Sequence, residues 1–513
     1  MLCRMSDIVL ATLNAKYIHA AFGLRYLLAN LGPLQARASI AEFTLEQRPL
    51  DIVEKLLALQ PRIVGLGVYI WNTAPLTEVV SLLKRVRPDL VIVVGGPEVS
   101  YENDRQDICR LADYVVCGEG ETAFAALCDH LLNGRRPEAK VIPAENVDVH
   151  RLTLPYDLYT DNDIAHRIIY VEASRGCPFS CEYCLSAIDP GVRRFPLPNL
   201  FTAFRKLLDR GVQQFKFVDR TFNLDIPFCL EILRFFLEHH RPGLFLHFEM
   251  MPDRFPPELR KLVCRFPPAS LQFEIGIQTF NEEVAALIQR RQNTLVAEEN
   301  LRFLREETEV HLHTDLIAGL PGESLDSFAA GFDRLVSLRP QEIQVGILKR
   351  LHGAAISRHD EAWEMTYSPA PPYEILKNKL LDFGTLQKLR RFSRYWDLVA
   401  NSGRFRRTAP LIWQDKPSAF AAFMRWSDWL YDRTGQVHQF SVNALAGHLF
   451  EYVTQVLGSN AERIAECLRD DMARGGRWEV PEFLKPHLGA TPSISASSTG
   501  SHRRQQRHLP YPH

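Results

Sequence analysis

Three cysteines on one short segment are the residues of this chain whose types and spacing best suit chemistry. Cys177, Cys181 and Cys184 follow a C-x3-C-x2-C spacing, with Tyr183 directly before the last of them. Three thiolates on one tight loop can hold three irons of a [4Fe–4S] cluster, whereas ferredoxin-type clusters use four cysteines. The fourth iron is then left without a protein ligand. The spacing therefore predicts a cluster with an open coordination site, where a substrate or cofactor can bind.

Two plainer interpretations of these cysteines are a zinc knuckle and three buried structural thiols. Zinc sites normally use four ligands, often as two C-x2-C pairs. No second pair stands nearby, because the next cysteine along the chain is Cys229. The spacing favours the cluster over both alternatives.

The run Ser174-Arg-Gly-Cys-Pro-Phe-Ser-Cys-Glu-Tyr-Cys-Leu185 resembles the cluster motif of the radical S-adenosylmethionine (SAM) superfamily. The resemblance implies that Cys177, Cys181 and Cys184 are the metal ligands of the catalytic cluster, and that Tyr183 lies at the cofactor. It also implies that the amino and carboxylate groups of SAM bind the open iron. An electron from the cluster then cleaves SAM to methionine and a 5′-deoxyadenosyl radical.

Length and composition are those of an ordinary multidomain protein. The chain has 513 residues, 24% charged and 46% hydrophobic, and a formal net charge of -1, so no basic field points to nucleic acid or an anionic membrane. The first residues lack an apolar signal region, and no run of about 18 apolar residues occurs, so we expect no signal peptide and no membrane span. The ten cysteines are mostly scattered singly, which indicates a reducing cytoplasm rather than a disulfide framework.

Residues 1–145 alternate short apolar runs with helical patterns. Such alternation predicts a doubly wound parallel sheet, in which ligands bind at the carboxyl ends of the strands. The predicted strands are 8–14, 38–45, 63–70, 90–95 and 114–117, with helices at 21–31, 50–59 and 74–86.

Three of these strand ends carry residues suited to a bound cofactor: Asn14 with the nearby His19, Gly67, and the pair Gly95–Gly96. The pattern resembles the cobalamin-binding domain that often precedes a radical SAM domain, and it implies that these residues contact cobalamin. A Gly-Gly turn lets the backbone approach the corrin closely. Ligation of cobalt from below would require D-x-H-x-x-G, which is absent here, so His19 could instead be a polar loop or capping residue. The domain could also keep this fold without a cofactor.

Residues 165–355 contain six strand–helix units, beginning with a strand that leads directly into the cysteine loop. The number and order of these units resemble the partial (β/α)6 barrel of radical SAM enzymes. In parallel α/β barrels the functional residues lie at the carboxyl ends of the strands.

The resemblance implies SAM contacts at several of these ends. Asp219 would meet the SAM amino group, or it could cap the next helix. Glu274 and Gln278 alternate onto one face of a strand, where an acceptor suits the ribose hydroxyls. Arg290 suits the SAM carboxylate, because a guanidinium pairs with two oxygens at once; the alternative is a surface helix residue.

The fifth strand runs into Gly319 and Leu320 in a Gly-Leu-Pro-Gly turn. In the family this backbone lies against the adenine, where groups without bulk are needed. Lys349 and His352 follow the last strand of the barrel and could reach the substrate.

Residues 370–486 show helical periodicity and many aromatic residues, from Tyr373 onwards. This region packs its own core or forms a lid over the barrel mouth. It resembles an uncharacterised extension of some cobalamin-type radical SAM proteins. Residues 489–513 are rich in Ser, Thr and Gly and then in Arg and His, which predicts a disordered tail.

The resemblance thus predicts a [4Fe–4S] cluster, SAM and cobalamin as cofactors, and methylation or rearrangement of an unactivated carbon in a small molecule. The partners expected are that substrate and an electron donor such as flavodoxin or ferredoxin, without a membrane or nucleic acid. Two alternatives remain open: a methylthiotransferase acting on tRNA or protein, and a sensor that binds cobalamin or a cluster without catalysis.

Overall fold

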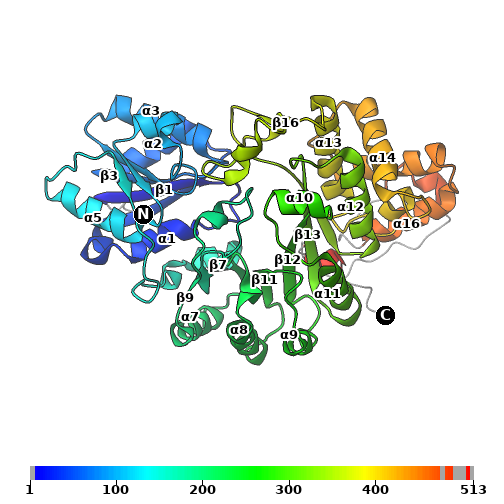
Figure 1. Ribbon diagram of the computed structural model, residues 1–513, viewed down its shortest axis with the longest axis horizontal. Helices are drawn as coiled ribbons and strands as arrows, with labels where there is room; N and C mark the ends of the chain where they lie inside the picture. The colour runs from blue at the N-terminus through cyan, green and yellow to red at the C-terminus, as the bar shows by residue number, and fades with distance from the viewer. Residues whose placement is uncertain (1–5, 474–479, 489–503, 509–513) are drawn as a thin grey trace.

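Two separate parallel sheets organise the chain, and a group of helices follows them. The computed structural model describes residues 6–473, 480–488 and 504–508. Figure 1 shows the N-terminal domain at one end, the second sheet in the middle and the C-terminal helices at the other end. The predicted α/β fold with a helical C-terminal region is therefore confirmed.

The N-terminal sheet is entirely parallel, with the strand order β2-β1-β3-β4-β5-β6. Its central strand β1 is buried along its whole length, because helices cover both faces of the sheet. Helices α1 and α5 contact each other, while α2, α3 and α4 form the other layer. The strands are β1 (Ile8–Asn14), β2 (Ala38–Thr44), β3 (Ile63–Gly67), β4 (Val91–Gly95), β5 (Tyr114–Cys117) and β6 (Val141–Pro143). The helices are α1 (Phe22–Ala29), α2 (Pro49–Ala58), α3 (Thr73–Val86), α4 (Asp107–Leu111) and α5 (Gly120–Leu132).

This sheet differs from the prediction in two places. β3 ends at Gly67 rather than at residue 70, because the chain turns there into the loop that begins α3. β6 was not expected, because its three residues, Val141–Pro143, are too few to show the pattern of a strand.

The central sheet has six parallel strands in the order β14-β13-β12-β11-β10-β7. β14 and β7 form its two edges, so the barrel is partial, as predicted. A short linker with α6 (Asp161–His166) precedes it, and an antiparallel pair, β8 (Ser174–Arg175) and β9 (Arg193–Arg194), flanks the cysteine loop. The strands are β7 (Ile169–Val171), β10 (Gln214–Phe217), β11 (Phe245–Glu249), β12 (Leu271–Gln278), β13 (His311–Ala318) and β14 (Glu342–Ile347). The helices are α7 (Leu197–Asp209), α8 (Ile226–Glu238), α9 (Pro257–Val263), α10 (Glu282–Leu287), α11 (Thr294–Glu307) and α12 (Leu325–Ser337).

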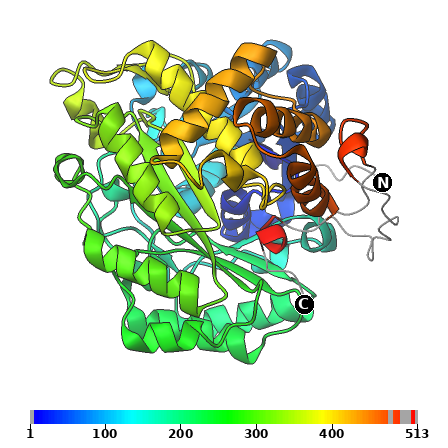
Figure 2. The same ribbon diagram turned by 90° about the vertical axis from the view of Figure 1, so that its right-hand side faces the viewer.

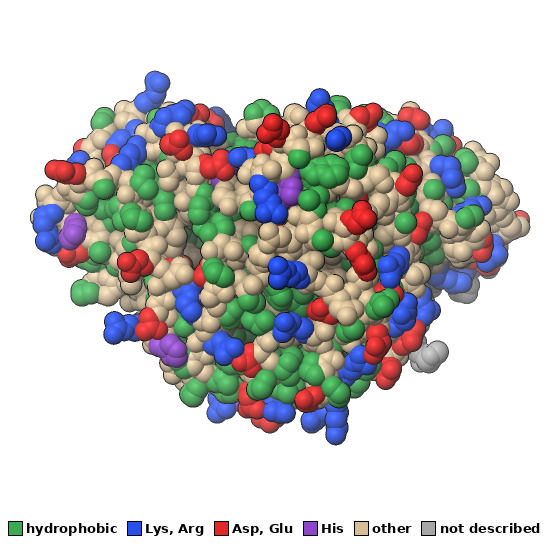
Figure 3. Space-filling view, in the orientation of Figure 1, with side chains coloured by type: hydrophobic (Ala, Val, Ile, Leu, Met, Phe, Trp, Pro, Cys, Tyr) green, Lys and Arg blue, Asp and Glu red, His purple; other side chains and the backbone are tan. Residues whose placement is uncertain are grey.

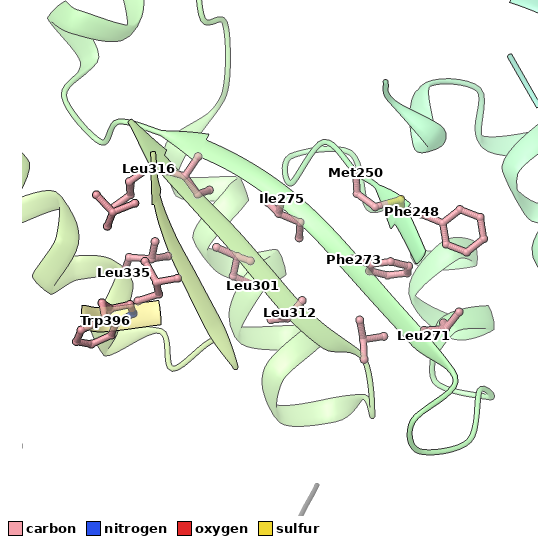
Figure 4. Packing of buried hydrophobic residues seen from close by; sticks show 14 of the residues in the cluster. Phe248, Met250, Leu271, Phe273, Ile275, Leu301, Leu312, Leu316, Leu335 and Trp396 are labelled. Carbon is pink, nitrogen blue, oxygen red and sulfur yellow. The ribbon is translucent and has the colours of Figure 1, made fainter. Parts of the chain in front are cut away.

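The two faces of the central sheet differ sharply in polarity. Phe273 and Ile275 of β12 belong to a buried apolar cluster with Leu301 of α11 and Trp396 of the C-terminal region (Figure 4). Glu274, between them, points to the opposite face, because successive side chains of a strand alternate. The helices therefore cover an apolar outer face, and the inner face is left polar for a site.

The C-terminal region is helical, as predicted, but it begins later. Ile375–Lys377 is a strand, β16, paired with β15 (Thr366–Tyr367), so the predicted helix around Leu376 is wrong. The first helix begins after Asp382, whose side chain accepts a hydrogen bond from the Thr385 amide and caps it. The helices are α13 (Phe383–Val399), α14 (Ala419–Thr434), α15 (Val442–Glu451) and α16 (Ala461–Ala473). Figure 2 shows them stacked beside the barrel.

Most of the predicted disordered tail lies outside the described residues. Residues 504–508 are described, and they include a short 3-10 turn, Gln505–His508. Arg504 pairs with Glu342 at the start of β14, at 2.9 Å. For this short stretch the structure therefore shows order where the sequence predicted none.

Charges of both signs are mixed on one face of the described molecule. Figure 3 shows basic and acidic side chains interspersed on this face of the molecule, in keeping with a formal net charge of -1. No helix within the described ranges is both long and apolar enough to cross a membrane.

Candidate functional site

The three cysteines line one pocket of about 140 Å³ at the carboxyl ends of the barrel strands, together with Tyr183. Cys177 and Cys181 are buried, Cys184 is partly exposed, and none of them forms a disulfide. The hairpin of β8 and β9 carries the loop. All three thiols therefore face the same space, as the spacing predicted.

This donor set fits a cluster better than a single ion. Over residues 6–473, 480–488 and 504–508, no group of three His, Cys, Asp or Glu is arranged to hold one metal ion. A [4Fe–4S] cluster instead takes each thiolate at a different corner, so its cysteines stand further apart. The zinc alternative therefore has no support from the geometry.

Asp219 lies behind the cysteine loop rather than in the pocket. Its carboxyl group accepts hydrogen bonds from the Ala173 amide at 2.9 Å and from the Ser174 hydroxyl at 2.7 Å, and the residue is 1% exposed. Burial raises its pKa to about 7. The capping alternative is wrong, because Asp225 caps α8; the contact of Asp219 with the SAM amino group stays a prediction. Asp219 anchors the start of the cysteine loop.

Three acidic residues line the barrel side of the pocket, from neighbouring strands: Glu249 of β11, Glu274 of β12 and Asp315 of β13. Burial raises the pKa of Glu249 to about 7. Burial alone would raise the pKa of Glu274 too, but the hydrogen bond from His247, at 2.8 Å, holds it at about 2. Glu274 is thus an ionised acceptor in the pocket, where the sequence placed it.

Arg290 also lines the pocket, but its guanidinium is already engaged. It donates to the Gly276 carbonyl at 2.5 Å and to the Cys181 sulfur at 3.7 Å. The alternative of a surface residue is therefore wrong. In this structure Arg290 pairs with a cluster cysteine, and the predicted contact with the SAM carboxylate stays a prediction.

Gln278 and the Gly319–Leu320 turn do not line the pocket. A bulge between Gly276 and Gln278 interrupts the regular pairing of β12. The Gln278 side-chain amide occupies the space that a Cβ atom of the pocket residue Gly276 would take, so its predicted contact with the SAM ribose stays a prediction. At Gly319 a Cβ atom would lie 2.6 Å from a methyl group of Ile375. The space beside Gly319, which we expected adenine to occupy, is therefore filled by Ile375 of β16.

A second and larger cavity, of about 470 Å³, lies between the N-terminal sheet and the barrel. Gly67, Gly95 and Gly96 line it, as predicted for a cofactor at these strand ends. A Cβ atom at Gly67 would lie 3.3 Å from Leu24, which lines the same cavity, so glycine keeps this slot open. At Gly96, whose φ is +113°, a Cβ atom would lie 2.6 Å from the Val68 carbonyl, so this glycine is also required by the chain's own backbone.

The walls of this cavity fit a large amphipathic cofactor such as cobalamin. Leu24 and Phe124, from α1 and α5, give it an apolar wall beside the glycine-lined strand ends. The barrel side adds the polar groups Glu172 and Ser186, which suit the amide side chains of a corrin. Apolar walls with a few polar groups are typical of cofactor sites.

Asn14 and His19 lie outside the lining of this cavity. The ring of His19 contacts the Tyr170 hydroxyl of β7 at 2.7 Å, and Asn14 donates to the His19 carbonyl at 2.8 Å. His19 thus joins the first domain to the barrel. Because its side chain does not line the cavity, the geometry gives no support for His19 as a cobalt ligand.

Sequence reasoning missed an ionic cluster between the two domains. Arg175, two residues before Cys177, pairs with Glu121 of the N-terminal domain and with Glu172, both at 2.8 Å. The signal was available, since Cys117-Gly-Glu-Gly-Glu121 and Ser174-Arg-Gly-Cys177 are complementary in charge. Nothing in residue order showed that these motifs meet.

His352 was expected near the substrate, but it contacts the N-terminal domain instead. Its Nδ1 lies 3.3 Å from a carboxylate oxygen of Glu98, which also accepts a hydrogen bond from the Tyr373 hydroxyl at 2.8 Å. Lys349 is exposed and its backbone bridges to Glu374. Through Glu98, His352 and Tyr373 hold the loop that follows Gly96.

The fold and the paired cavities define the class of protein: an α/β protein with a cofactor-type parallel domain in front of a partial barrel that carries a cysteine loop. Family models agree with both parts, because a B12 binding domain matches residues 8–128 and the radical SAM superfamily matches residues 171–335. Residues 171–335 therefore form a domain of the radical SAM superfamily, and residues 8–128 form a B12-binding domain. A protein family of unknown function (DUF4080) matches residues 361–508.

Curated relatives match only in part. The chain is 28% identical over 325 residues to 2-(S-pantetheinyl)-carbapenam-3-carboxylate methyltransferase of Streptantibioticus cattleyicolor, covering 56% of this chain and 47% of that protein. It is 27% identical over 207 residues to an uncharacterized methyltransferase of Pyrococcus horikoshii, covering 36% and 44%. The chain thus spans less than half the length of these two relatives.

Two solved structures share the fold. The cobalamin-dependent SAM radical enzyme OxsB superposes with a TM-score of 0.61 at 14% identity, covering 92% of this chain and 80% of that one. The radical SAM methyltransferase TsrM from Kitasatospora setae gives 0.58 at 17% identity, covering 72% and 80%. Identities this low show the fold alone. This shared fold agrees with the matches of the N-terminal domain to the B12 binding domain and of the barrel to the radical SAM superfamily.

Proposed function

We propose that this protein transfers a methyl group to an unactivated carbon of a small molecule, with the cluster and SAM in the barrel pocket and cobalamin in the larger cavity. The observation that carries the proposal is that the two cavities adjoin. Ser186 and Arg220 line both of them, so a substrate at this junction would meet both cofactors. When bound, the cofactors supply a hydrogen-abstracting radical and a transferable methyl group.

The chain's own residues position these groups and exclude water. Cys177, Cys181 and Cys184 would hold three irons, and the ionised Glu274 would accept hydrogen bonds from the SAM ribose. Arg220, three residues after β10, lies 3.9 Å from the carboxylate of Glu249. Cofactor enzymes rely on the protein for this placement and electrostatics.

The partners follow from the same proposal. The methyl acceptor is a small molecule, because the junction of the cavities lies between two domains rather than on an open face. The electron comes from a low-potential donor such as flavodoxin or ferredoxin. Methylthiotransferases also occur among the relatives, for example the ribosomal protein uS12 methylthiotransferase of Myxococcus xanthus at 23% identity, but the B12-binding match favours methyl transfer through cobalamin.

The first test measures metal content. The protein is purified anaerobically, its cluster is reconstituted, hydroxocobalamin is added, and iron and cobalt are measured per chain after desalting. We expect about four irons and stoichiometric cobalt, with 5′-deoxyadenosine formed from SAM under a strong reductant. Cys181→Ala should lose the iron and the deoxyadenosine but keep the cobalt, and Cys264→Ala, an exposed thiol, should keep all three. Iron without cobalt in the wild type would refute the proposal.

A further inference from the structure

Arg175 lies between the two cofactor sites and contacts residues that line both sides of the large cavity. Its guanidinium donates to Glu172 through Nη2 at 2.8 Å and Nε at 3.0 Å. Its other terminal nitrogen, Nη1, lies 2.8 Å from Glu121 of α5 and 3.7 Å from Glu119. The side chain is 13% exposed, and it stacks over the Tyr26 ring at 4.7 Å. One cation therefore joins the barrel to the B12-binding domain.

The connection from Arg175 to the cluster loop is short and stiff. Gly176, with φ +89°, separates Arg175 from Cys177, and a Cβ atom there would lie 1.8 Å from the Gly191 carbonyl. The Cys177 amide donates to the Asp189 carbonyl at 3.0 Å. Because the backbone is held at this turn, a shift of Arg175 is passed on to Cys177.

The other end of the contact is just as close to the larger cavity. Glu119 and Glu121 alternate with Gly118 and Gly120, and all four residues line it. Glu119 is held in turn by Arg193 of β9, through two hydrogen bonds of 2.7 and 2.8 Å. The two strands of the hairpin therefore each supply an arginine to the same segment of the B12-binding domain.

We propose that Arg175 is a positioning residue that fixes the separation between the cluster and the cobalamin cavity, an assignment that rests on the proposed function. A planar guanidinium suits this task because it holds carboxylates in two directions with fixed geometry. A lysine would keep the charge but could not hold both. Loss of the contact would leave each domain folded and each cofactor bound, while their spacing would no longer be set.

The test compares Arg175→Gln and Arg175→Lys with Arg194→Gln. Arg194 lies on the same hairpin, opposite Ser174. It pairs with Asp225 of the barrel domain rather than with the B12-binding domain, so it is a matched control. We expect all variants to keep about four irons and stoichiometric cobalt. Methyl transfer from SAM to reduced cobalamin, followed by visible absorption, should fall about tenfold to a hundredfold in Arg175→Gln, as for a displacement of the reacting groups by about 1 Å. Formation of 5′-deoxyadenosine at the cluster should stay close to the wild-type rate.

A second readout does not depend on turnover. The magnetic coupling between the reduced cluster and cob(II)alamin is measured by electron paramagnetic resonance. In Arg175→Gln this coupling should become weaker or more widely distributed, and in Arg194→Gln it should stay unchanged. A methyl transfer rate in Arg175→Lys between those of the wild type and Arg175→Gln would agree with a lysine that keeps the charge but cannot hold both carboxylates. An unchanged interaction and an unchanged methyl transfer rate in Arg175→Gln would overturn the proposal.

The positioning role and the proposed function can fail separately. A wild type without cobalt refutes the proposed function whatever Arg175 does. Hydrogen exchange in the protein without cofactors then still tests the contact, because Arg175→Gln should speed exchange at residues 118–121 and 174–177. If Arg175→Gln does not fold, Glu121→Gln removes the partner on the B12-binding domain instead. Unchanged exchange in both variants would show that the contact holds nothing in place.

Discussion

Single residues show that a side chain predicted to bind a ligand can instead hold the loop that binds it. Asp219 follows β10 at the place where a SAM contact was expected, yet it is 1% exposed and bonded to Ala173 and Ser174. The Ala173 amide and the Ser174 hydroxyl both donate to this carboxyl group, while its burial disfavours the charged form. An acidic residue at the end of a barrel strand is typical of a ligand contact. Only the partners of Asp219 in the structure reveal its positioning role.

This environment makes a prediction about pH. The pKa of Asp219 is raised to about 7 by burial, above the value of about 3.9 for an exposed aspartate. Between these values the folded state holds a proton that the unfolded state has released, so stability falls as pH rises from about 4 to 7, by up to about 1.4 kcal/mol per pH unit, and then levels off. Asp219→Asn, which mimics the protonated form, should remove this slope. Denaturant midpoints of wild type and variant at pH 5 and pH 8 measure it, and parallel pH profiles would contradict it.

Glu249 makes a second prediction at this scale, for the binding of SAM. It lines the pocket of the three cysteines, where we propose that SAM binds, and burial raises its pKa to about 7. A sulfonium cation favours the ionised carboxylate, so SAM affinity should increase from pH 6 to pH 8, by at most about tenfold per pH unit. Equilibrium dialysis on the reconstituted protein measures this. Glu249→Gln should flatten the dependence, while Glu258→Gln, an exposed site on α9, should keep it. Affinity for the uncharged 5′-methylthioadenosine should not follow pH; a dependence as steep as that of SAM would refute the explanation.

At the scale of elements, the segment after β14 reaches back to the first domain. It lies above the barrel, between the N-terminal domain and α13 (Figure 1). Arg350 pairs with Glu102 at 3.2 Å, and Tyr373 donates to the buried Glu98 at 2.8 Å. Both carboxylates belong to the loop that follows Gly95 and Gly96 at the cavity. The segment therefore holds a loop that lines the cobalamin site.

Removal of one hydrogen bond tests this role. Tyr373→Phe leaves a buried carboxylate without its hydroxyl partner, which costs about 1.5–3 kcal/mol for a charged acceptor. Because that carboxylate fixes the loop at Gly96, we expect weaker cobalamin binding, measured by visible titration of the purified protein. Tyr367→Phe is the matched control, since the Tyr367 hydroxyl is buried without a partner; it should bind cobalamin as the wild type does. Equal affinities in all three proteins would show that the loop needs no such support.

Elements were predictable where the pattern is local. The parallel strands of both sheets follow from the alternation of apolar strands with helices, and the cysteine loop follows from its own spacing. The pairing of Arg175 with Glu121, or of Glu98 with Tyr373, was not predictable, because these residues are far apart in sequence and charge alone selects no partner. The bulge after Gly276 and the packing of Ile375 against Gly319 likewise depend on tertiary contacts, which cannot be read from the sequence.

For the whole molecule, the apolar cores show which parts unfold together. One large buried cluster runs from the barrel strands into the C-terminal helices, including Phe273, Phe332 and Trp396. Two smaller clusters lie on the faces of the N-terminal sheet. The barrel and the C-terminal helices therefore share one hydrophobic core. We expect the two regions to unfold together.

This arrangement predicts two unfolding transitions rather than three. Trp396→Ala removes a side chain that is 4% exposed and packs against Phe332 at 4.8 Å between ring centroids, which should cost about 3–5 kcal/mol. Hydrogen exchange resolved by segment should show α13 and the strands β12–β14 losing protection together, with β1 and β3 unaffected. Val79→Ala, in the core of the first domain, should do the reverse, and Leu295→Ala, 74% exposed, should change neither. If Trp396→Ala loosened the C-terminal helices while β12–β14 kept their protection, the helices would be a separate folding unit and the shared core would not join them to the barrel.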